Sequence, residues 1–196
     1  MKNSILTVFA AAMLITGCKK SESTAADSRS IDSAITKNDS AMPSNTTTSS
    51  DSLSDQDKKF ANTAAKGGMM EVMLGQLAET NASHPVVKAL GQMMVNDHTK
   101  ANDELKQWAS KAGYTLPSAP DADQQKKYDD LKAKKGAEFD RKYTELMVDD
   151  HREDIEVFKK EGAEGRETSL KSFANNTLPT LEHHLKESEK AKNVVK

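Results

Sequence analysis

Cysteine is almost absent from this chain of 196 residues, since Cys18 is its only thiol. A single cysteine excludes an internal disulfide, a zinc site built on cysteine pairs and a dithiol redox centre. Basic residues are not in excess either, because 28 lysines and arginines are interleaved with 30 acidic residues. We therefore expect no nucleic-acid partner, which would require a clustered positive surface.

A long hydrophobic run is also missing. The apolar stretch from Ile5 to Ile15 is short, whereas a membrane-spanning helix needs about 20 residues. It follows Lys2 and leads into Thr16-Gly17-Cys18, an order that resembles the lipobox of bacterial lipoprotein signals. We expect residues 1–17 to be a signal peptide, cleaved before Cys18, and the membrane to be a partner through lipid on Cys18. The alternative is an ordinary cleaved signal with an incidental cysteine.

The residues after Cys18 predict the location and a tether. Lys19, rather than aspartate, follows the cysteine, and by analogy with enteric sorting this favours the outer membrane, with the chain facing the periplasm. From Lys19 to Leu53, 15 of 35 residues are Ser or Thr, and none is aromatic. Residues 18–53 are therefore expected to form a disordered linker that holds the folded part away from the lipid.

The rest of the chain, residues 54–192, has the composition of one helical domain. Ala, Leu, Lys, Glu, Gln and Met dominate, and no stretch alternates polar and apolar residues over the length of a strand. Capping signals and breaks predict helices at about residues 55–81, 84–112, 122–135, 137–161 and 169–192. Ser54 and Asp57 form a capping box for the first helix, and Gly113 is expected to close the second in a left-handed conformation.

The lengths of the connections predict the topology. The first two long helices, and the last two, are separated by only a few residues, which makes each pair antiparallel. About 24 residues separate the two pairs, enough to travel the full height of a bundle. This asymmetry favours a ferritin-like four-helix bundle with a long crossover. The alternative is a plain up-down-up-down bundle with a decorated loop.

Each long helix carries one titratable residue in its otherwise apolar seam. Steps of three and four residues place these groups near mid-height, at Glu71, His98, His151 and His184. If they converge, one carboxylate and three imidazoles are a suitable ligand set for a divalent metal ion such as zinc, copper or iron. The alternative is a set of core residues, each satisfied by a hydrogen bond to a neighbouring helix or to water.

The residues around these seams limit the chemistry. Di-iron sites in ferritin-like proteins use Glu-x-x-His on two helices, but the positions three before the histidines are Val95, Val148 and Leu181. A dinuclear iron centre is therefore not expected. Six methionines of the domain would suit copper together with imidazole, although methionine more commonly fills gaps in helical cores.

Two aspartates, Asp97 and Asp150, directly precede histidines of the seams. Each points about 100° away from its neighbour on the helix, so neither orients that histidine directly. We interpret both as outer-shell residues that serve adjacent helices or solvent.

Several longer motifs contain or flank the titratable residues of the seams. They are Phe60-x-x-x-Ala64-Ala65-x-x-Gly68, Glu71 with Leu74-Gly75-Gln76-Leu77-Ala78, Asp97-His98, Phe139-Asp140-x-x-Tyr143, Met147-Val148-x-Asp150-His151 and Leu178-Pro179-Thr180-Leu181-x-x-His184-Leu185. Over residues 54 to 190 this order resembles the bacterial secreted family catalogued as domain of unknown function 4142. The resemblance implies a ferritin-like fold without an assigned activity. His84 departs from the family pattern and is expected to be exposed and incidental, and His183 lies off the seam.

Two functions remain open from the sequence. It favours a lipid-anchored envelope protein whose bundle is a non-catalytic binding or structural module, with an envelope protein or the cell wall as partner. The second hypothesis is a metal-binding envelope protein that uses the Glu/His cluster. An enzyme is disfavoured, because no serine nucleophile or paired carboxylates stand out.

Overall fold

A computed structural model of the chain describes residues 53–196, and this part consists of helices and connections without a strand. The helices are α1 (Asp55–Asn81), α2 (Pro85–Ala112), α3 (Ala122–Lys132), α4 (Gly136–Glu164) and α5 (Thr168–Val194). The predicted all-α class is confirmed. Most predicted boundaries agree to within two residues, but α3 ends three residues earlier than expected and α4 three residues later.

The expected signal peptide (1–17), Cys18 and residues 18–52 of the expected linker lie outside the described residues. Leu53, the last residue assigned to that linker, is buried in the core. Within residues 53–196, no helix is both long and apolar enough to cross a bilayer.

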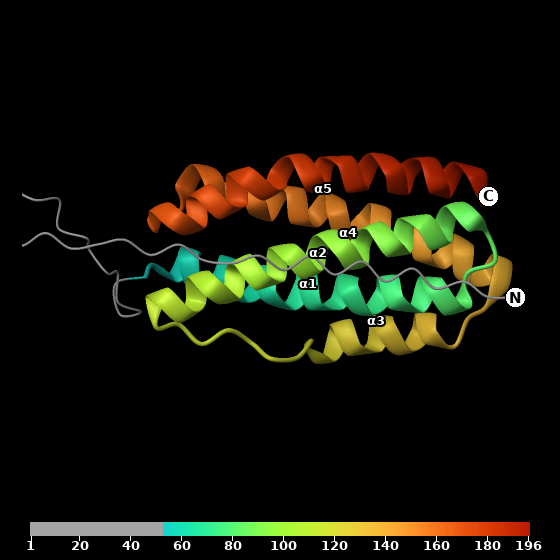
Figure 1. Ribbon diagram of the computed structural model, residues 1–196, viewed down its shortest axis with the longest axis horizontal. Helices are drawn as coiled ribbons and strands as arrows, with labels where there is room; N and C mark the ends of the chain where they lie inside the picture. Colours follow the sequence, from blue (N-terminus) through green and yellow to red (C-terminus); the bar gives the residue numbers. More distant parts are fainter. Residues whose placement is uncertain (1–52) are drawn as a thin grey trace, which may run out of the picture. The chain divides into compact units, whose positions relative to one another are not determined.

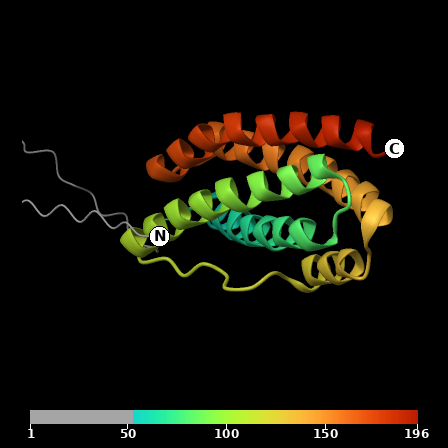
Figure 2. The same cartoon turned by 45° about the vertical axis from the view of Figure 1, so that its right-hand side comes forward.

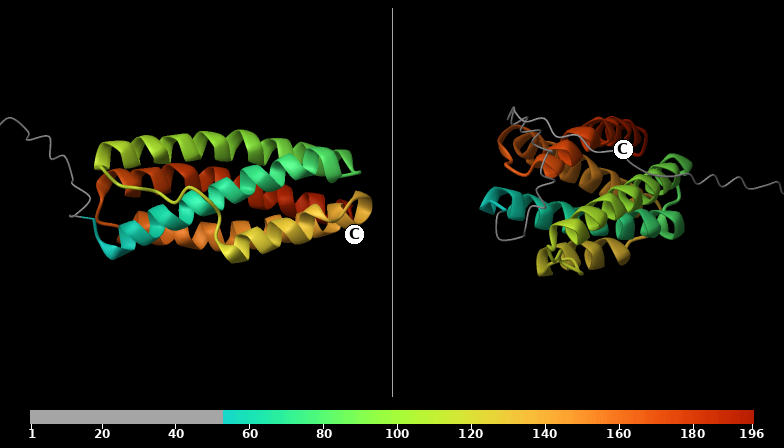
Figure 3. Two further views of the ribbon diagram at one scale, coloured as in Figure 1. Left: turned by 90° about the horizontal axis from the view of Figure 1, so that it is seen from below. Right: turned by 60° about the vertical axis from the view of Figure 1, so that its left-hand side comes forward.

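The four long helices form two antiparallel hairpins. Helix α1 packs against α2, and α4 packs against α5, with further contacts of α1 with α4 and of α2 with α5. Helix α2 ends where α1 begins, whereas α4 begins at the opposite end of the bundle (Figure 1). The crossover, which is the connection from α2 to α4 and contains α3, runs along this height beside α1 and α4. It lies on the side away from α5 (Figures 2 and 3). The predicted ferritin-like topology with a long crossover is therefore confirmed.

Two buried aspartates tie the starts of neighbouring helices together. Asp57 completes the predicted capping box with Ser54, and its Oδ1 also accepts hydrogen bonds from the backbone N–H groups of Arg166 and Glu167, at 2.9 and 3.2 Å. At the other end, the Asp140 carboxylate accepts from the backbone N–H groups of Ser83 and His84, at 3.1 and 3.0 Å. The start of α1 is thus fixed to the start of α5, and the start of α2 to α4.

His84 has a structural role that the sequence did not suggest. Its Nδ1 accepts a hydrogen bond from the backbone N–H of Val86, at 3.2 Å, and so caps the N-terminus of α2. The side chain is partly buried rather than exposed. The expectation that His84 is exposed and incidental was therefore wrong, because a histidine before Pro85 supplies the acceptor that a serine or aspartate usually gives at this position.

Helices α1 and α2 approach most closely where Gly75 faces Gly91. A Cβ at Gly75 would lie 2.6 Å from the backbone oxygen of Gly91, and a Cβ at Gly91 would lie 2.8 Å from the backbone oxygen of Gly75. Only glycine allows this contact without moving the helices apart. Gly113, with φ of 64°, closes α2 in the left-handed conformation, as predicted.

The core consists of two apolar clusters, one toward each end of the bundle. One is rich in aromatic residues and includes Phe60, Leu105, Trp108, Phe158 and Leu170. The other is rich in methionine and includes Met70, Leu74, Met94, Phe139 and Met147. On α2, α4 and α5 a buried histidine lies between the buried segments that contribute to the two clusters, and on α1 Glu71 directly follows Met70, where the second cluster begins. This polar layer is the candidate site.

Candidate metal centre

The polar layer consists of one side chain from each long helix. Glu71 comes from α1, His98 from α2, His151 from α4 and His184 from α5, and the side chains of all four are at most 8% exposed. The residues come together because each interrupts the apolar seam of its helix at the same height of the bundle. The convergence expected from the helical spacing is therefore present in the structure.

The polar atoms of the layer face one another at short distances. Oε2 of Glu71 lies 2.5 Å from Nε2 of His98 and 3.3 Å from Nε2 of His151. The same Nε2 of His151 is 3.2 Å from Nδ1 of His184. One ring nitrogen from each of the three histidines lies within 4.8 Å of the other two.

Partners outside the layer determine which ring nitrogens carry protons. Nδ1 of His151 is 2.9 Å from the backbone oxygen of Met147, and a carbonyl only accepts, so this nitrogen carries the hydrogen. Nε2 of His184 is 2.8 Å from Oδ2 of Asp97, and a carboxylate also only accepts. In the neutral rings, the two nitrogens that face each other across 3.2 Å are therefore both lone-pair acceptors.

The layer leaves several buried polar atoms unpaired. Neither carboxylate oxygen of Glu71, nor Nε2 of His98, has a partner in hydrogen-bond geometry, although the two residues touch. A buried polar group without a partner costs about 1–3 kcal/mol. A bound cation or an added proton would satisfy these lone pairs, and metal-binding histidines usually donate their second N–H to a carbonyl or carboxylate, as His151 and His184 do here.

The separations within the layer suit one small metal ion. Ligands at 2.0–2.1 Å from a tetrahedral zinc ion are about 3.3 Å apart. Two of the three measured separations, 3.2 and 3.3 Å, match this edge. The third, 2.5 Å between Glu71 and His98, is shorter, so these two side chains would have to move apart slightly around an ion.

The charges of the layer depend on one another. Burial would raise the pKa of Glu71, but the electrostatic interactions with His151 and His98 outweigh burial and lower this pKa to about 2. Burial lowers the pKa of His98, yet the contact with Glu71 holds it above its ordinary value. Burial and the neighbouring histidines lower the pKa of His184 to about 4. Glu71 is thus an anion and His184 a neutral imidazole at neutral pH.

The other predicted residues lie around the layer rather than in it. Asp97 contacts His184 of the adjacent helix α5, at 2.8 Å between Oδ2 and Nε2. Asp150 instead pairs with Lys127 of α3, with 2.9 Å between Oδ1 and Nζ. His183 is exposed. Met70, Met94 and Met147 pack in an apolar cluster.

The sequence reasoning missed several residues next to the layer. Asp154 lies on α4, one turn after His151, and burial raises its pKa to about 8, with the charge of Glu71 adding to the shift. The hydroxyl of Tyr143 is buried without a partner, and burial together with the charge of Glu71 raises its pKa. Asp154 had a signal, the spacing His151-x-x-Asp154, which places both on one helix face. Lys127 had none, because its position depends on how α3 lies over α4.

Comparisons with known proteins give the family and the fold. The family described as "Domain of unknown function (DUF4142)" matches residues 42–191. Solved structures similar to this one include "CopM in the Cu(II)-bound form", with 15% identity, 70% of this chain and 95% of that chain covered, and a TM-score of 0.60. "CopM in the Ag-bound form (by co-crystallization)" matches with 17% identity, covers 68% of this chain and 93% of that chain, and has a TM-score of 0.57. At these identities the likeness shows the fold alone. No curated protein sequence matches this one.

Proposed function

Because the chain belongs to the DUF4142 family, whose description names no activity, we propose from the geometry of the polar layer that the bundle binds one divalent transition-metal ion. The ligands are Glu71, His98, His151 and His184. The sequence favoured a binding or structural module without a metal. The convergence of these four side chains supports the metal hypothesis instead.

One observation carries the proposal. The hydrogen bonds of His151 and His184 to Met147 and Asp97 leave two lone pairs facing each other across 3.2 Å, beside the unpaired carboxylate of Glu71. Core histidines that serve only stability would pair with a donor, because burying unpaired acceptors is unfavourable. A cation at this position pairs with all of them at once.

The donor set indicates the kind of metal. Three imidazoles and one carboxylate suit Cu²⁺ and Zn²⁺, whereas Cu⁺ and Ag⁺ prefer thiolate and thioether ligands. Among divalent ions of the first transition row, Cu²⁺ has the highest intrinsic affinity for such a site. The printed titles of similar folds name proteins in Cu(II)-, Cu(I)- and Ag-bound forms, which supports metal binding by a bundle of this architecture.

Four protein ligands point to binding rather than catalysis. Catalytic zinc sites keep one position open for water or substrate, whereas closed sites use four protein ligands. We therefore place the function in metal holding or sequestration, and not in an enzymatic reaction. The lipobox-like segment before Cys18 supports a lipid anchor, and Lys19 after the cysteine favours the outer membrane, with the bundle on a tether in the periplasm.

The experiment is equilibrium metal binding by the full chain without a histidine tag. The protein is dialysed against Cu²⁺ or Zn²⁺, and bound metal per chain is measured. We expect one ion per wild-type chain and an affinity at least about 100-fold lower for His151→Ala. With Co²⁺ as a probe, the visible absorption bands should indicate nitrogen ligands.

His183→Ala is the matched control, because His183 is exposed and directly precedes His184. This variant should bind like the wild type. Equal binding by wild type and His151→Ala, or no stoichiometric uptake of any of the three ions, would contradict the proposal. Uptake of Ag⁺ alone, unaffected by His151→Ala, would point to methionine ligands instead.

A further inference from the structure

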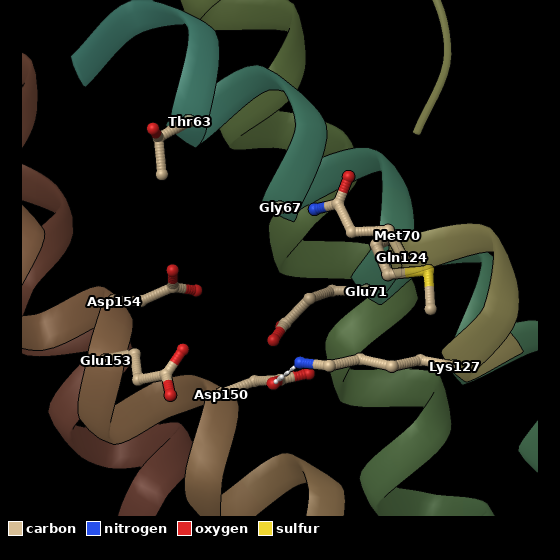
Figure 4. A pocket seen from close by; sticks show the side chains of 9 residues that line it. All are labelled: Thr63, Gly67, Met70, Glu71, Gln124, Lys127, Asp150, Glu153 and Asp154. Atoms are coloured by element: carbon tan, nitrogen blue, oxygen red, sulfur yellow. Dashed lines mark hydrogen bonds and ion pairs between the residues drawn. The ribbon is translucent and has the colours of Figure 1, made fainter. Parts of the chain in front are cut away.

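A cavity of about 130 Å³ lies beside the polar layer, between α1, α3 and α4 (Figure 4). It is lined by Thr63, Gly67, Met70, Glu71, Gln124, Lys127, Asp150, Glu153 and Asp154. We call it the acidic cavity, because four of these side chains are carboxylates and one is a cation. Its volume has room for several water molecules.

Glu71 connects the acidic cavity to the polar layer. Its side chain is 2% exposed, and it points into the cavity in Figure 4. Its Oε2 contacts His98 and His151, while neither of its oxygens has a hydrogen-bond partner. The same carboxylate therefore belongs to the layer and forms the inner wall of the cavity.

The outer part of the acidic cavity is a surface for cations. Asp150, Glu153 and Asp154 approach from consecutive turns of one face of α4, opposite Glu71 on α1 (Figure 4). Lys127 of α3 supplies the one positive charge among the lining residues, and its Nζ lies 2.9 Å from Oδ1 of Asp150. Carboxylates that line a recess with low-dielectric walls concentrate cations and accelerate their association.

A second void reaches the layer from the aromatic end of the core, and it is much less suitable. It touches His98, but it measures about 20 Å³ and is lined mostly by apolar residues such as Leu105, Phe158 and Leu181. A void of this size holds about one water molecule. Asp154 is the one carboxyl group in its lining, and a hydrated ion would find no space there.

We propose that the acidic cavity is an outer cation site through which a hydrated divalent metal ion reaches the polar layer, with Lys127 as the group that the ion displaces. The inference rests on the proposed function, since the layer is the destination of the ion. Asp150 and Glu153 hold the ion through carboxylate oxygens and retained water, and Asp154 joins them when the ion displaces its proton. Glu71 then passes it to the three imidazoles. The ammonium group of Lys127 competes for the same carboxylates and therefore slows loading.

The test is the rate of Co²⁺ uptake by the full, tag-free chain, followed by absorption after rapid mixing. Lys127→Ala removes the competing charge and should raise the association rate constant about 3- to 10-fold. Glu153→Lys adds a positive charge at the mouth of the cavity and should lower it about 10-fold. Both effects should shrink at high salt, because they act through long-range attraction. Binding at equilibrium should remain one ion per chain.

Two controls carry the same charge changes outside the cavity. Lys126→Ala lies on α3, where Lys126 is 74% exposed and pairs with Asp130. Glu156→Lys lies on α4, where the side chain of Glu156 is 76% exposed. Both should load like the wild type.

If Lys127→Ala and Glu153→Lys take up Co²⁺ at the rates of their controls, the cavity is not the route, although the layer still binds the ion. If the wild type takes up no Co²⁺ at equilibrium, the proposed function itself fails, and this inference with it. If one of the two cavity variants does not fold, the other decides the outcome.

Discussion

Two buried glutamates, Glu71 and Glu161, lie in regions of the bundle with opposite electrostatics. Both side chains are inaccessible or nearly so, and each has a carboxylate oxygen without a hydrogen-bond partner. Glu71 faces three imidazoles, which lower its pKa to about 2. Glu161 lies near the end of α4, where burial and the neighbouring Asp57 raise its pKa to about 7, against a hydrogen bond from Gln56. Burial alone does not determine the state of a carboxyl group, because its neighbours decide which form is stable.

The difference has a physical consequence for each region. The anionic Glu71 can offset one of the two positive charges of a divalent metal ion. Glu161 faces a carboxylate, Asp57, whose own pKa is kept below its ordinary value by Ser54 and by the backbone of Arg166 and Glu167, although burial would raise it. The polar layer is therefore suited to a cation, whereas the end of α4 retains a proton.

The largest expected effect is the gain in the free energy of unfolding when metal binds, which should depend on Glu71 and not on Glu161. At a free ion concentration about 1,000-fold above Kd, a ligand that binds only the folded state raises the free energy of unfolding by about 4 kcal/mol. We expect this gain in the wild type and in Glu161→Gln, and we expect most of it to be lost in Glu71→Gln. Urea unfolding with and without Zn²⁺ measures it. The comparison fails if Glu161→Gln loses the gain as completely as Glu71→Gln does.

The next effect concerns the pH dependence of stability at Glu161. In the unfolded chain this carboxyl has its ordinary pKa of 4.5, and in the folded chain a pKa of about 7. Between these values the folded state holds a proton that the unfolded state has lost, so stability falls as pH rises. The stabilisation is complete below about pH 4.5 and is lost as pH rises through about 7. Glu161→Gln cannot ionise, and its amide can donate to Asp57.

We therefore expect metal-free Glu161→Gln to match the wild type near pH 4 and to exceed its free energy of unfolding at pH 8.5 by about 2 kcal/mol, with an upper limit near 3 kcal/mol. Urea unfolding across this pH range in the presence of a chelator measures the difference. Glu164→Gln is the control, because the side chain of Glu164 is 65% exposed on the same helix, and it should give a flat difference. A difference of the same size at both pH values would mean that Glu161 does not change its protonation.

The sequence predicted the polar layer, whose residues follow the periodicity of their helices. It missed the proximity of Glu161 and Asp57, which depends on contacts between distant parts of the chain. Glu71, His98, His151 and His184 were found because a 3.6-residue repeat places each in a seam, and short connections place the seams in one core. Glu161 and Asp57 are more than 100 positions apart in sequence, and no helical spacing brings them together. Their proximity follows from the way the end of α4 lies beside the start of α1.

The same limit applies to the partners of the polar layer. The angle of about 100° between Asp97 and His98 excluded a contact between these neighbours. It did not predict which helix Asp97 would reach. That depends on the rotation of α2 against α5, which places Oδ2 at 2.8 Å from His184. Asp150 occupies the equivalent position on α4, yet it faces α3 and pairs with Lys127. Asp97 and Asp150, each directly before a histidine of the layer, thus acquire different roles from the helices that they contact.

The smallest expected effect tests whether Asp97, which lies outside the polar layer, orients His184. It would act on His184 from a neighbouring helix, as Asp57 acts on Glu161 at the end of α4. Asp97→Ala removes the acceptor that directs Nδ1 of His184 inward, and the affinity for Zn²⁺ should fall about 10-fold. This is the low end of the range for such partners, because the side chain of Asp97 is 43% exposed and water can replace it. Asp103→Ala is the control, since Asp103 pairs only with exposed Lys106 on the same helix. Competitive titration with a chromophoric chelator measures both. A loss as large as that of His151→Ala would make Asp97 a ligand, and no loss would show that packing alone orients His184.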